Sequence, residues 1–146
     1  MRRRLLALGF VFLFGGVSLG RDAAEPQVQP QSYPAVTILS TGASILGEPI
    51  RYPTTGPARI TAAIVTLAPG QKTSVHKHGV PLFAYILEGE LTVDYAGYTK
   101  RTFHAGEAFM EGMDVAHFGV NSGKQTMRLL AVYLGAQGAQ DVIPVR

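Results

Sequence analysis

Cysteine is absent from this sequence. Its absence excludes disulfide bonds, thiolate metal ligands and a cysteine nucleophile, so the fold must rely on its hydrophobic core. Charged residues are scarce, at 16%, whereas hydrophobic residues make up 47%. This balance is typical of a compact folded domain and unlike that of a disordered chain. The 146 residues suffice for one domain with a substantial core.

A basic surface of the kind that binds nucleic acid is also lacking. The formal charge of +3 comes from 13 basic and 10 acidic residues. Three of the basic residues are Arg2, Arg3 and Arg4, and without them the two signs balance. The excess of positive charge therefore belongs to the N-terminal segment, and we expect no nucleic-acid partner.

That N-terminal segment has the layout of a secretory signal peptide (1–20). Three arginines precede an uncharged apolar run at 5–19, and the small residues Ser18 and Gly20 mark a cleavage site after Gly20. An uncleaved membrane anchor is the alternative, but the run is short for a hydrocarbon core of ~30 Å. We therefore expect a periplasmic or secreted bacterial protein with no stable membrane span after cleavage.

Helical periodicity is missing from the rest of the chain. A Gln-, Ala- and Pro-rich stretch (21–35) indicates a linker or N-terminal arm, and the folded domain is predicted at 36–146. Many short β-rich runs separated by glycine turns predict an all-β sandwich or jelly-roll barrel. The predicted strands are 36–39, 49–52, 59–67, 82–87, 90–95, 98–103, 108–111, 115–120, 127–134 and 142–143.

Three histidines form the main candidate site. His76 and His78 lie two residues apart, so in a strand both side chains project from one face. His117, some forty residues later, is a candidate third ligand. Three neutral nitrogen donors suit Fe, Mn, Zn, Ni or Cu and leave open positions for a small molecule. The simpler alternative is a chance polar pair beside Lys77.

Two spaced motifs give the chain a resemblance to the cupin superfamily, in its single-domain, type 2-like form. The first motif is matched by Gly70, His76, His78 and Gly89, and the second by Gly106, His117 and Asn121. The resemblance covers residues 59–134 and implies a cupin-type jelly-roll β-barrel. It also implies a homodimer, because single-domain cupins often exchange strands between subunits, with residues 28–39 as the candidate exchanged arm.

The sequence departs from the cupin motifs at three positions. The motif Glu falls at Leu82 or Phe83, Gly112 stands at the motif Pro, and Asp114 stands at an inner Gly. The expected ligand set is therefore three histidines, which resembles certain non-haem iron dioxygenases acting on thiols or diketones and favours Fe(II), with Mn, Zn or Ni as alternatives. Glu111 is a candidate fourth ligand, although a solvated Glu at a turn is the reading we favour slightly.

Two functions remain open at this level. The first is a small-molecule metalloenzyme, in which Tyr85 or Glu111 supplies an acid, a base or a substrate contact. The second is a non-catalytic module of the cell envelope that binds a metal or a small ligand. A purely structural barrel, in which the histidines bond one another, is a third and weaker reading. Whether the protein is an enzyme is left undecided by the sequence.

Overall fold

The computed structural model describes residues 33–145. The predicted signal peptide (1–20) and most of the predicted arm (21–35) lie outside these residues. The described strands belong to one compact unit that begins at Val36. They are β1 (Ala58–Leu67), β2 (His76–His78), β3 (Leu82–Glu88), β4 (Glu90–Tyr95), β5 (Thr99–His104), β6 (Ala108–Met110), β7 (His117–Val120), β8 (Met127–Ala136) and β9 (Val142–Pro144).

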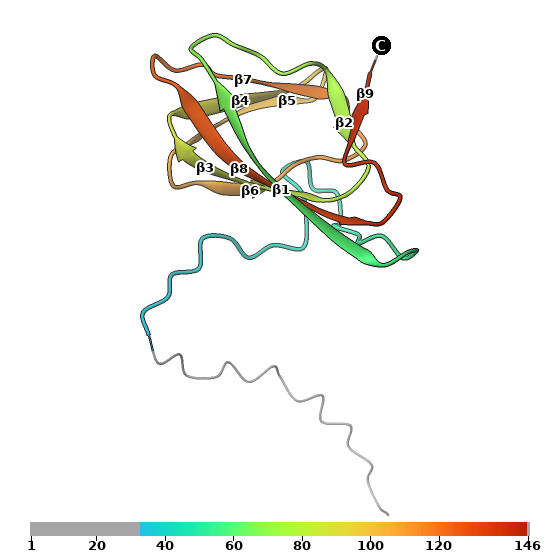
Figure 1. Cartoon of the computed structure of the whole chain (residues 1–146). Coiled ribbons are helices and arrows are strands. Elements are labelled where there is room, and N and C mark those ends of the chain that lie inside the picture. Colours follow the sequence, from blue (N-terminus) through green and yellow to red (C-terminus); the bar gives the residue numbers. More distant parts are fainter. Residues whose placement is uncertain (1–32, 146) are drawn as a thin grey trace, which may run out of the picture. The chain divides into compact units, whose positions relative to one another are not determined.

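The strands of this unit form two antiparallel sheets. One sheet has the order β1-β8-β3-β6, and the other has the order β5-β4-β7-β2-β9. In Figure 1, β4, β5 and β7 face β3, β6 and β8 across the interior, and β2 and β9 lie together at one end. The all-β prediction is thus confirmed. No helix long and apolar enough to cross a membrane occurs within residues 33–145.

Alternation along the strands decides which side chains fill the space between the sheets. In β4, Leu91, Val93 and Tyr95 are buried, while Asp94 on the other face pairs with Lys100 of β5 at 2.8 Å. In β8, alternate residues from Met127 to Ala131 are likewise buried. A period of two is expected for a strand with one face on the core. The two inward faces together form one hydrophobic core.

Gly89 is the single residue that carries the chain from β3 in one sheet to β4 in the other. Its φ of +73° lies in the left-handed region, which glycine enters without steric cost. A Cβ at this position would lie 2.9 Å from the carbonyl oxygen of Thr126. The Gly that matches the end of the first motif is therefore required by both backbone conformation and space.

Some predicted strands are not formed as expected. Among residues 33–145, the run 36–39 has no strand partner and is exposed except for the half-buried Leu39, and the 49–52 run is reduced to an isolated bridge between Ala43 and Pro49. Pro49 and Pro53 lack the N–H groups that a longer ladder would need. Residues 82–87 alternate between buried and exposed, and are not buried on both faces, so that Leu87 faces outward. The strand predicted at 115–120 begins only at His117.

Candidate metal centre

One wall of the site is a row of side chains on the inward face of the second sheet. His76 of β2 lies directly opposite His117 of β7, and His117 lies opposite Tyr95 of β4. Directly opposite residues in an antiparallel pair share a face of the sheet. His78, two residues after His76, shares that face too, as the spacing predicted. Lys77 therefore points to the other face.

Glu111 enters the site from the facing sheet. It follows β6, and its N–H donates to the carbonyl oxygen of Leu82 at 3.0 Å, extending the register that pairs Phe83 with Met110. Leu82 and Glu111 are thus cross-strand neighbours on one face. The carboxylate missing from position 82 is replaced by one on the adjacent strand. The expectation of a solvated Glu111 is wrong, because this residue is only 8% exposed.

The three histidines are oriented by backbone carbonyl groups. The Nδ1 atoms of His76, His78 and His117 lie 2.8, 3.2 and 2.8 Å from the carbonyl oxygens of Ser74, Asp141 and Val115, respectively. A carbonyl accepts a hydrogen bond, so in each ring Nδ1 carries the proton and Nε2 is left to face the interior. Such carbonyl contacts are typical partners of metal-bound imidazoles, because they fix the ring and its tautomer.

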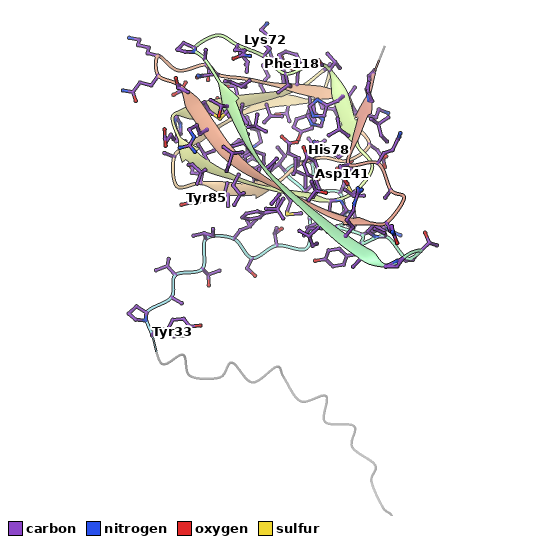
Figure 2. The ribbon with its side chains drawn as sticks, viewed as in Figure 1. Tyr33, Lys72, His78, Tyr85, Phe118 and Asp141 are labelled. Carbon is purple, nitrogen blue, oxygen red and sulfur yellow. The ribbon has the colours of Figure 1, made fainter. Side chains whose placement is uncertain are left out.

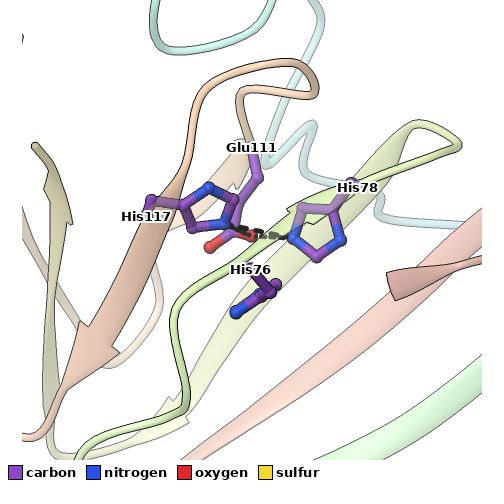
Figure 3. Close-up of side chains that lie close together, drawn as sticks. All are labelled: His76, His78, Glu111 and His117. Atoms are coloured by element: carbon purple, nitrogen blue, oxygen red, sulfur yellow. Dashed lines mark hydrogen bonds and ion pairs between the residues drawn. The ribbon is translucent and has the colours of Figure 1, made fainter. Parts of the chain in front are cut away.

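The inward-facing atoms of these residues converge on one point. Figure 3 shows the rings of His78 and His117 directed at the Glu111 carboxylate, with His76 beside them. The Nε2 atoms of His78 and His117 lie 3.3 Å apart, and Oε2 of Glu111 lies 2.6 and 3.1 Å from them. One ligand atom from each of the four residues lies within 4.8 Å of all the others.

These separations suit a divalent metal ion. Ligands about 2.1 Å from an ion lie ~3.0 Å apart in an octahedral arrangement and ~3.4 Å apart in a tetrahedral one. The 3.1 and 3.3 Å separations fall in this range, and the 2.6 Å separation is that of a charge-assisted hydrogen bond. Imidazole nitrogen and carboxylate oxygen are both common ligands of Fe, Mn and Zn. The four residues therefore form a candidate metal site.

The carboxylate sets the electrostatics of this cluster. Burial acts to raise the pKa of Glu111, but hydrogen bonds with His117 and His78 outweigh it and hold the pKa at about 2. Burial acts to lower the pKa of His117, but the bond to Glu111 outweighs it and raises the pKa above its ordinary value. Burial lowers the pKa of His76. Glu111 therefore stays ionised at neutral pH and partly compensates a bound cation.

Metal affinity is expected to fall as the pH is lowered through the raised pKa of His117. His117 must lose its Nε2 proton to bind a metal, and its raised pKa means that this proton is held more tightly than usual. Affinity should be full above that pKa and should drop about tenfold per pH unit below it for each proton displaced. Glu111, with a pKa of about 2, contributes nothing to this dependence. Titration calorimetry from pH 5.5 to 8, in buffers of different ionisation enthalpy, measures both affinity and proton release; a pH-independent affinity contradicts the expectation.

Tyr95 and Gly112 support the position of Glu111. The N–H of Gly112, the residue after Glu111, donates to the Tyr95 hydroxyl at 2.9 Å, and the Tyr95 ring lies 4.7 Å from the His117 ring between centroids. A proline at position 112, as in the cupin motif, has no N–H to donate. A Cβ there would also lie 2.6 Å from Cδ1 of Leu46. Glycine at position 112 therefore provides the N–H that binds the Tyr95 hydroxyl and leaves the space that Leu46 occupies.

Removing the Tyr95 hydroxyl should weaken both the fold and the site. In Tyr95→Phe the buried Gly112 N–H loses its acceptor, which costs about 1–3 kcal/mol of stability. Metal affinity should fall as well, because Glu111 is adjacent. Urea unfolding and metal titration measure the two effects. Tyr98→Phe is the matched control, because Tyr98 is 74% exposed; equal stability of the two variants would contradict this role for Tyr95.

A cavity of about 390 Å³ opens beside the candidate metal site. His76, His78 and Glu111 form part of its wall. Tyr133, which the sequence analysis missed, also lines it, with its ring 5.8 Å from the His78 ring. Its signal in the sequence was the alternation of β8, which places Tyr133 on the same face as Leu129 and Ala131.

Tyr85, the other residue predicted to contact a substrate, is not brought to this cavity. It is half-buried in β3, three residues from Leu82 and therefore on the other face of the strand. Figure 2 shows Tyr85 well away from His78 and Asp141. The apolar run at 82–87 concealed this alternation. Among the predicted site residues, the structure therefore brings together the three histidines and Glu111, and leaves Tyr85 apart.

The comparisons with known proteins agree with this architecture. Residues 63–133 match the family model described as the cupin domain. No curated protein matches the chain. A solved protein from Klebsiella pneumoniae with a double-stranded β-helix domain is similar at a TM-score of 0.51 and 17% identity, over 66% of this chain and 91% of that one. A similarity at this level of identity supports the fold alone.

Two further solved structures are similar over shorter stretches. A Cupin 2 conserved barrel domain protein from Salinispora arenicola has 23% identity and a TM-score of 0.49, over 60% of this chain and 72% of that one. An oxalate decarboxylase from Bacillus subtilis, described with Mn(II) centres, has 22% identity and a TM-score of 0.49 over 59% of this chain. This chain spans only 24% of that decarboxylase.

Proposed function

Residues 63–133 form a cupin domain, and on that premise we propose that the chain is a metalloenzyme that binds a divalent metal ion and acts on a small molecule. The observation that carries the proposal is the convergence of four donors, His76, His78, Glu111 and His117, beside a cavity. A non-haem iron oxygenase, as predicted from the sequence, is the specific form of this function that the experiment below tests. The substrate would enter the cavity and reach the metal from the side of His76, the most exposed of the four donors.

The ligand set supports a six-coordinate ion. Four protein ligands leave two positions of an octahedral ion for a small molecule, whereas a four-coordinate zinc ion would be closed by them. Fe(II), Mn(II) and Ni(II) can each be six-coordinate and fit this set, whereas a four-coordinate Zn(II) ion is less suited. A bound redox-active ion would supply Lewis-acid and one-electron chemistry. The presence of Glu111 removes the basis for the analogy with dioxygenases that use three histidines alone.

The chain's own residues orient the reactants and exclude water. The carbonyl groups of Ser74, Asp141 and Val115 hold the imidazoles in place before any metal arrives, which reduces the cost of organising the site. Apolar side chains from both sheets line the cavity and keep its dielectric low. The Tyr133 hydroxyl is placed to hydrogen-bond a ligand in the cavity.

Metal analysis combined with oxygen uptake tests the proposal. The protein is purified without affinity metals, and its metal content is measured by mass spectrometry. We expect one Fe or Mn per chain in the wild type and background levels in His78→Ala. Oxygen consumption by the Fe(II)-loaded protein is then measured with diketones, thiols and phenolic acids, with His104→Ala, which lies outside the cluster, as the control. Absence of turnover with every metal and substrate would refute the catalytic part.

A non-catalytic binding module is the second candidate. It is favoured by one observation: apart from the four donors, the described residues that line the cavity offer only the hydroxyls of Thr73, Ser74 and Tyr133 for polar chemistry. No second acid–base pair lies among them. Zinc alone, or no metal, in the native protein would favour this reading over the enzyme.

Export of the protein is a separate part of the proposal. It rests on the sequence of residues 1–20, in which three arginines, an apolar run and a small-residue cleavage site follow one another. Sequencing of the N-terminus of the protein from a periplasmic fraction tests it, and we expect mature chains that begin at Arg21. The homodimer also stays a prediction.

A further inference from the structure

The cavity beside the metal site is lined mainly by apolar side chains. Val65 and Leu67 of β1, Leu82 of β3, Leu91 of β4 and Leu129 of β8 all contribute. At about 390 Å³ it is within the usual size range of small-molecule sites. A ligand as small as two or three heavy atoms would leave most of this apolar wall in contact with water, which is unfavourable.

No lysine or arginine among residues 33–145 lines this cavity. Lys77 lies between the two histidines of β2, but alternation turns it to the outer face, where it is paired with Ile143. Lys72 lies with its Nζ 5.4 Å from the centre of the Phe118 ring, well away from His78 in Figure 2. Among residues 33–145, no cationic side chain is therefore placed to neutralise an anion inside the cavity.

Two acidic residues lie near the centre. Asp141, whose carbonyl orients His78, has its carboxylate paired with Arg59 at 2.7 Å on the outside. Glu48 accepts a hydrogen bond from the N–H of Met113, on the loop between Glu111 and His117. A divalent ion bound to Glu111 and neutral imidazoles carries a net charge of +1. One further negative charge neutralises that centre, whereas two leave an uncompensated charge in an apolar cavity, which is costly.

We propose that this cavity selects an apolar ligand with a single chelating head of charge −1, and that it discriminates against small dianions such as oxalate. The inference rests on the proposed metal site but concerns the ligand class. The head would occupy the two metal positions that the protein leaves open, and the hydrocarbon tail would lie against Val65, Leu67 and Leu129. Oxalate also offers two oxygen donors, but it has no tail and carries a second charge.

A series of 2-oxo acids tests the inference directly. Pyruvate, 2-oxohexanoate and 2-oxooctanoate share one monoanionic chelating head and differ only in tail length, and oxalate is the dianionic comparison. Binding to the Mn(II)-loaded protein is measured by titration calorimetry. Each added CH₂ that is fully buried should tighten binding by about fourfold at most. We expect 2-oxooctanoate to bind more than tenfold tighter than pyruvate and tighter than oxalate. Affinity that does not change with tail length, or tighter binding of oxalate, overturns the inference.

A charge added at the cavity mouth should shift this preference. Val75 lines the cavity and is 43% exposed, so Val75→Lys places an ammonium group at the mouth without burying it. We expect oxalate affinity to rise several-fold in this variant, while the tail-length dependence persists. Ile64→Lys is the matched control, because Ile64 is similarly exposed, at 48%, but does not line the cavity. Equal oxalate affinity in the two variants would contradict the inference that the cavity disfavours dianions because it has no cationic side chain.

The failure of the inference can be told apart from the failure of the proposed function. Metal content is measured first on the same samples, and absence of metal counts against the proposed function alone. The tail-length series is repeated on metal-free protein, where the apolar wall is still present. We expect weaker binding throughout but the same increase with tail length. A tail-length dependence supports the apolar cavity whether or not metal is retained, and a flat series refutes it in either case.

Discussion

Exchanging the side chains at positions 82 and 111 is expected to preserve metal binding, although the single change Glu111→Leu abolishes it. The two residues are direct cross-strand neighbours on the inward face, joined by the hydrogen bond from the Glu111 N–H to the Leu82 carbonyl. A carboxylate at position 82 therefore starts from the adjacent strand and still projects into the same space between the sheets. The double variant Leu82→Glu/Glu111→Leu also conserves the volume of the core.

The expected magnitudes are large. Loss of a partner that only orients a metal ligand typically costs 10–100-fold in affinity, so loss of the ligand itself in Glu111→Leu should cost at least about a hundredfold. The double variant should recover to within about tenfold of the wild type. Metal titration measures the affinities, and circular dichroism checks that each variant is folded. Glu88→Leu, at an exposed residue paired with Arg128, is the control for loss of a carboxylate. A folded double variant that remains unable to bind metal would show that Glu111 is specifically required.

Removal of the metal should lower the thermal stability of the protein substantially. A ligand present at a thousand times its Kd stabilises the folded state by about 4.1 kcal/mol, if the unfolded chain does not bind it. For a folded unit of this size, such a change corresponds to a fall in Tm of about 10–20 °C. The structural reason is that the site joins both sheets: His76, His78 and His117 come from one, and Glu111 comes from the edge of the other.

Differential scanning calorimetry before and after dialysis against a chelator measures this effect, and re-addition of Mn(II) or Zn(II) should restore the Tm. His78→Ala provides the control, because its Tm should be insensitive to the chelator. If the wild type and this variant respond alike, the four-residue cluster does not hold a metal that contributes to stability.

The position of Glu111 illustrates how far sequence reasoning reached. Within one strand, a period of two is a local property, so His76 and His78 were placed on one face from their spacing alone. Between Glu111 and His117 the chain passes through a loop, and face parity cannot be carried across it. Only the register between β3 and β6 shows that Glu111 lies beside Leu82 and faces the histidines. The same limitation hid Tyr95, which is distant in sequence from Gly112 and His117 but contacts both.

Other differences have equally specific causes. The predicted strand at 36–39 had suitable residues but has no neighbouring strand to complete its hydrogen bonds. Tyr85 was a candidate because its hydroxyl could serve as an acid, a base or a substrate contact, but the apolar run around it gives no indication of which face is buried. In β4, by contrast, polar residues alternate with apolar ones, and the prediction of a strand with one inward face was confirmed.

The sequence by itself determined the all-β class, the resemblance to cupins and the pair of histidines on one strand face, because each depends on residue type and spacing along a short stretch. The tertiary structure alone decided that a carboxylate completes the candidate metal site, which side chains line the cavity and that, within the described part of the chain, none of them is cationic. These properties depend on which strands pair and in which register, and pairing is set by contacts between residues distant in the chain. A missing glutamate at position 82 therefore indicated a site of three histidines, until the neighbouring strand was seen to supply the carboxylate.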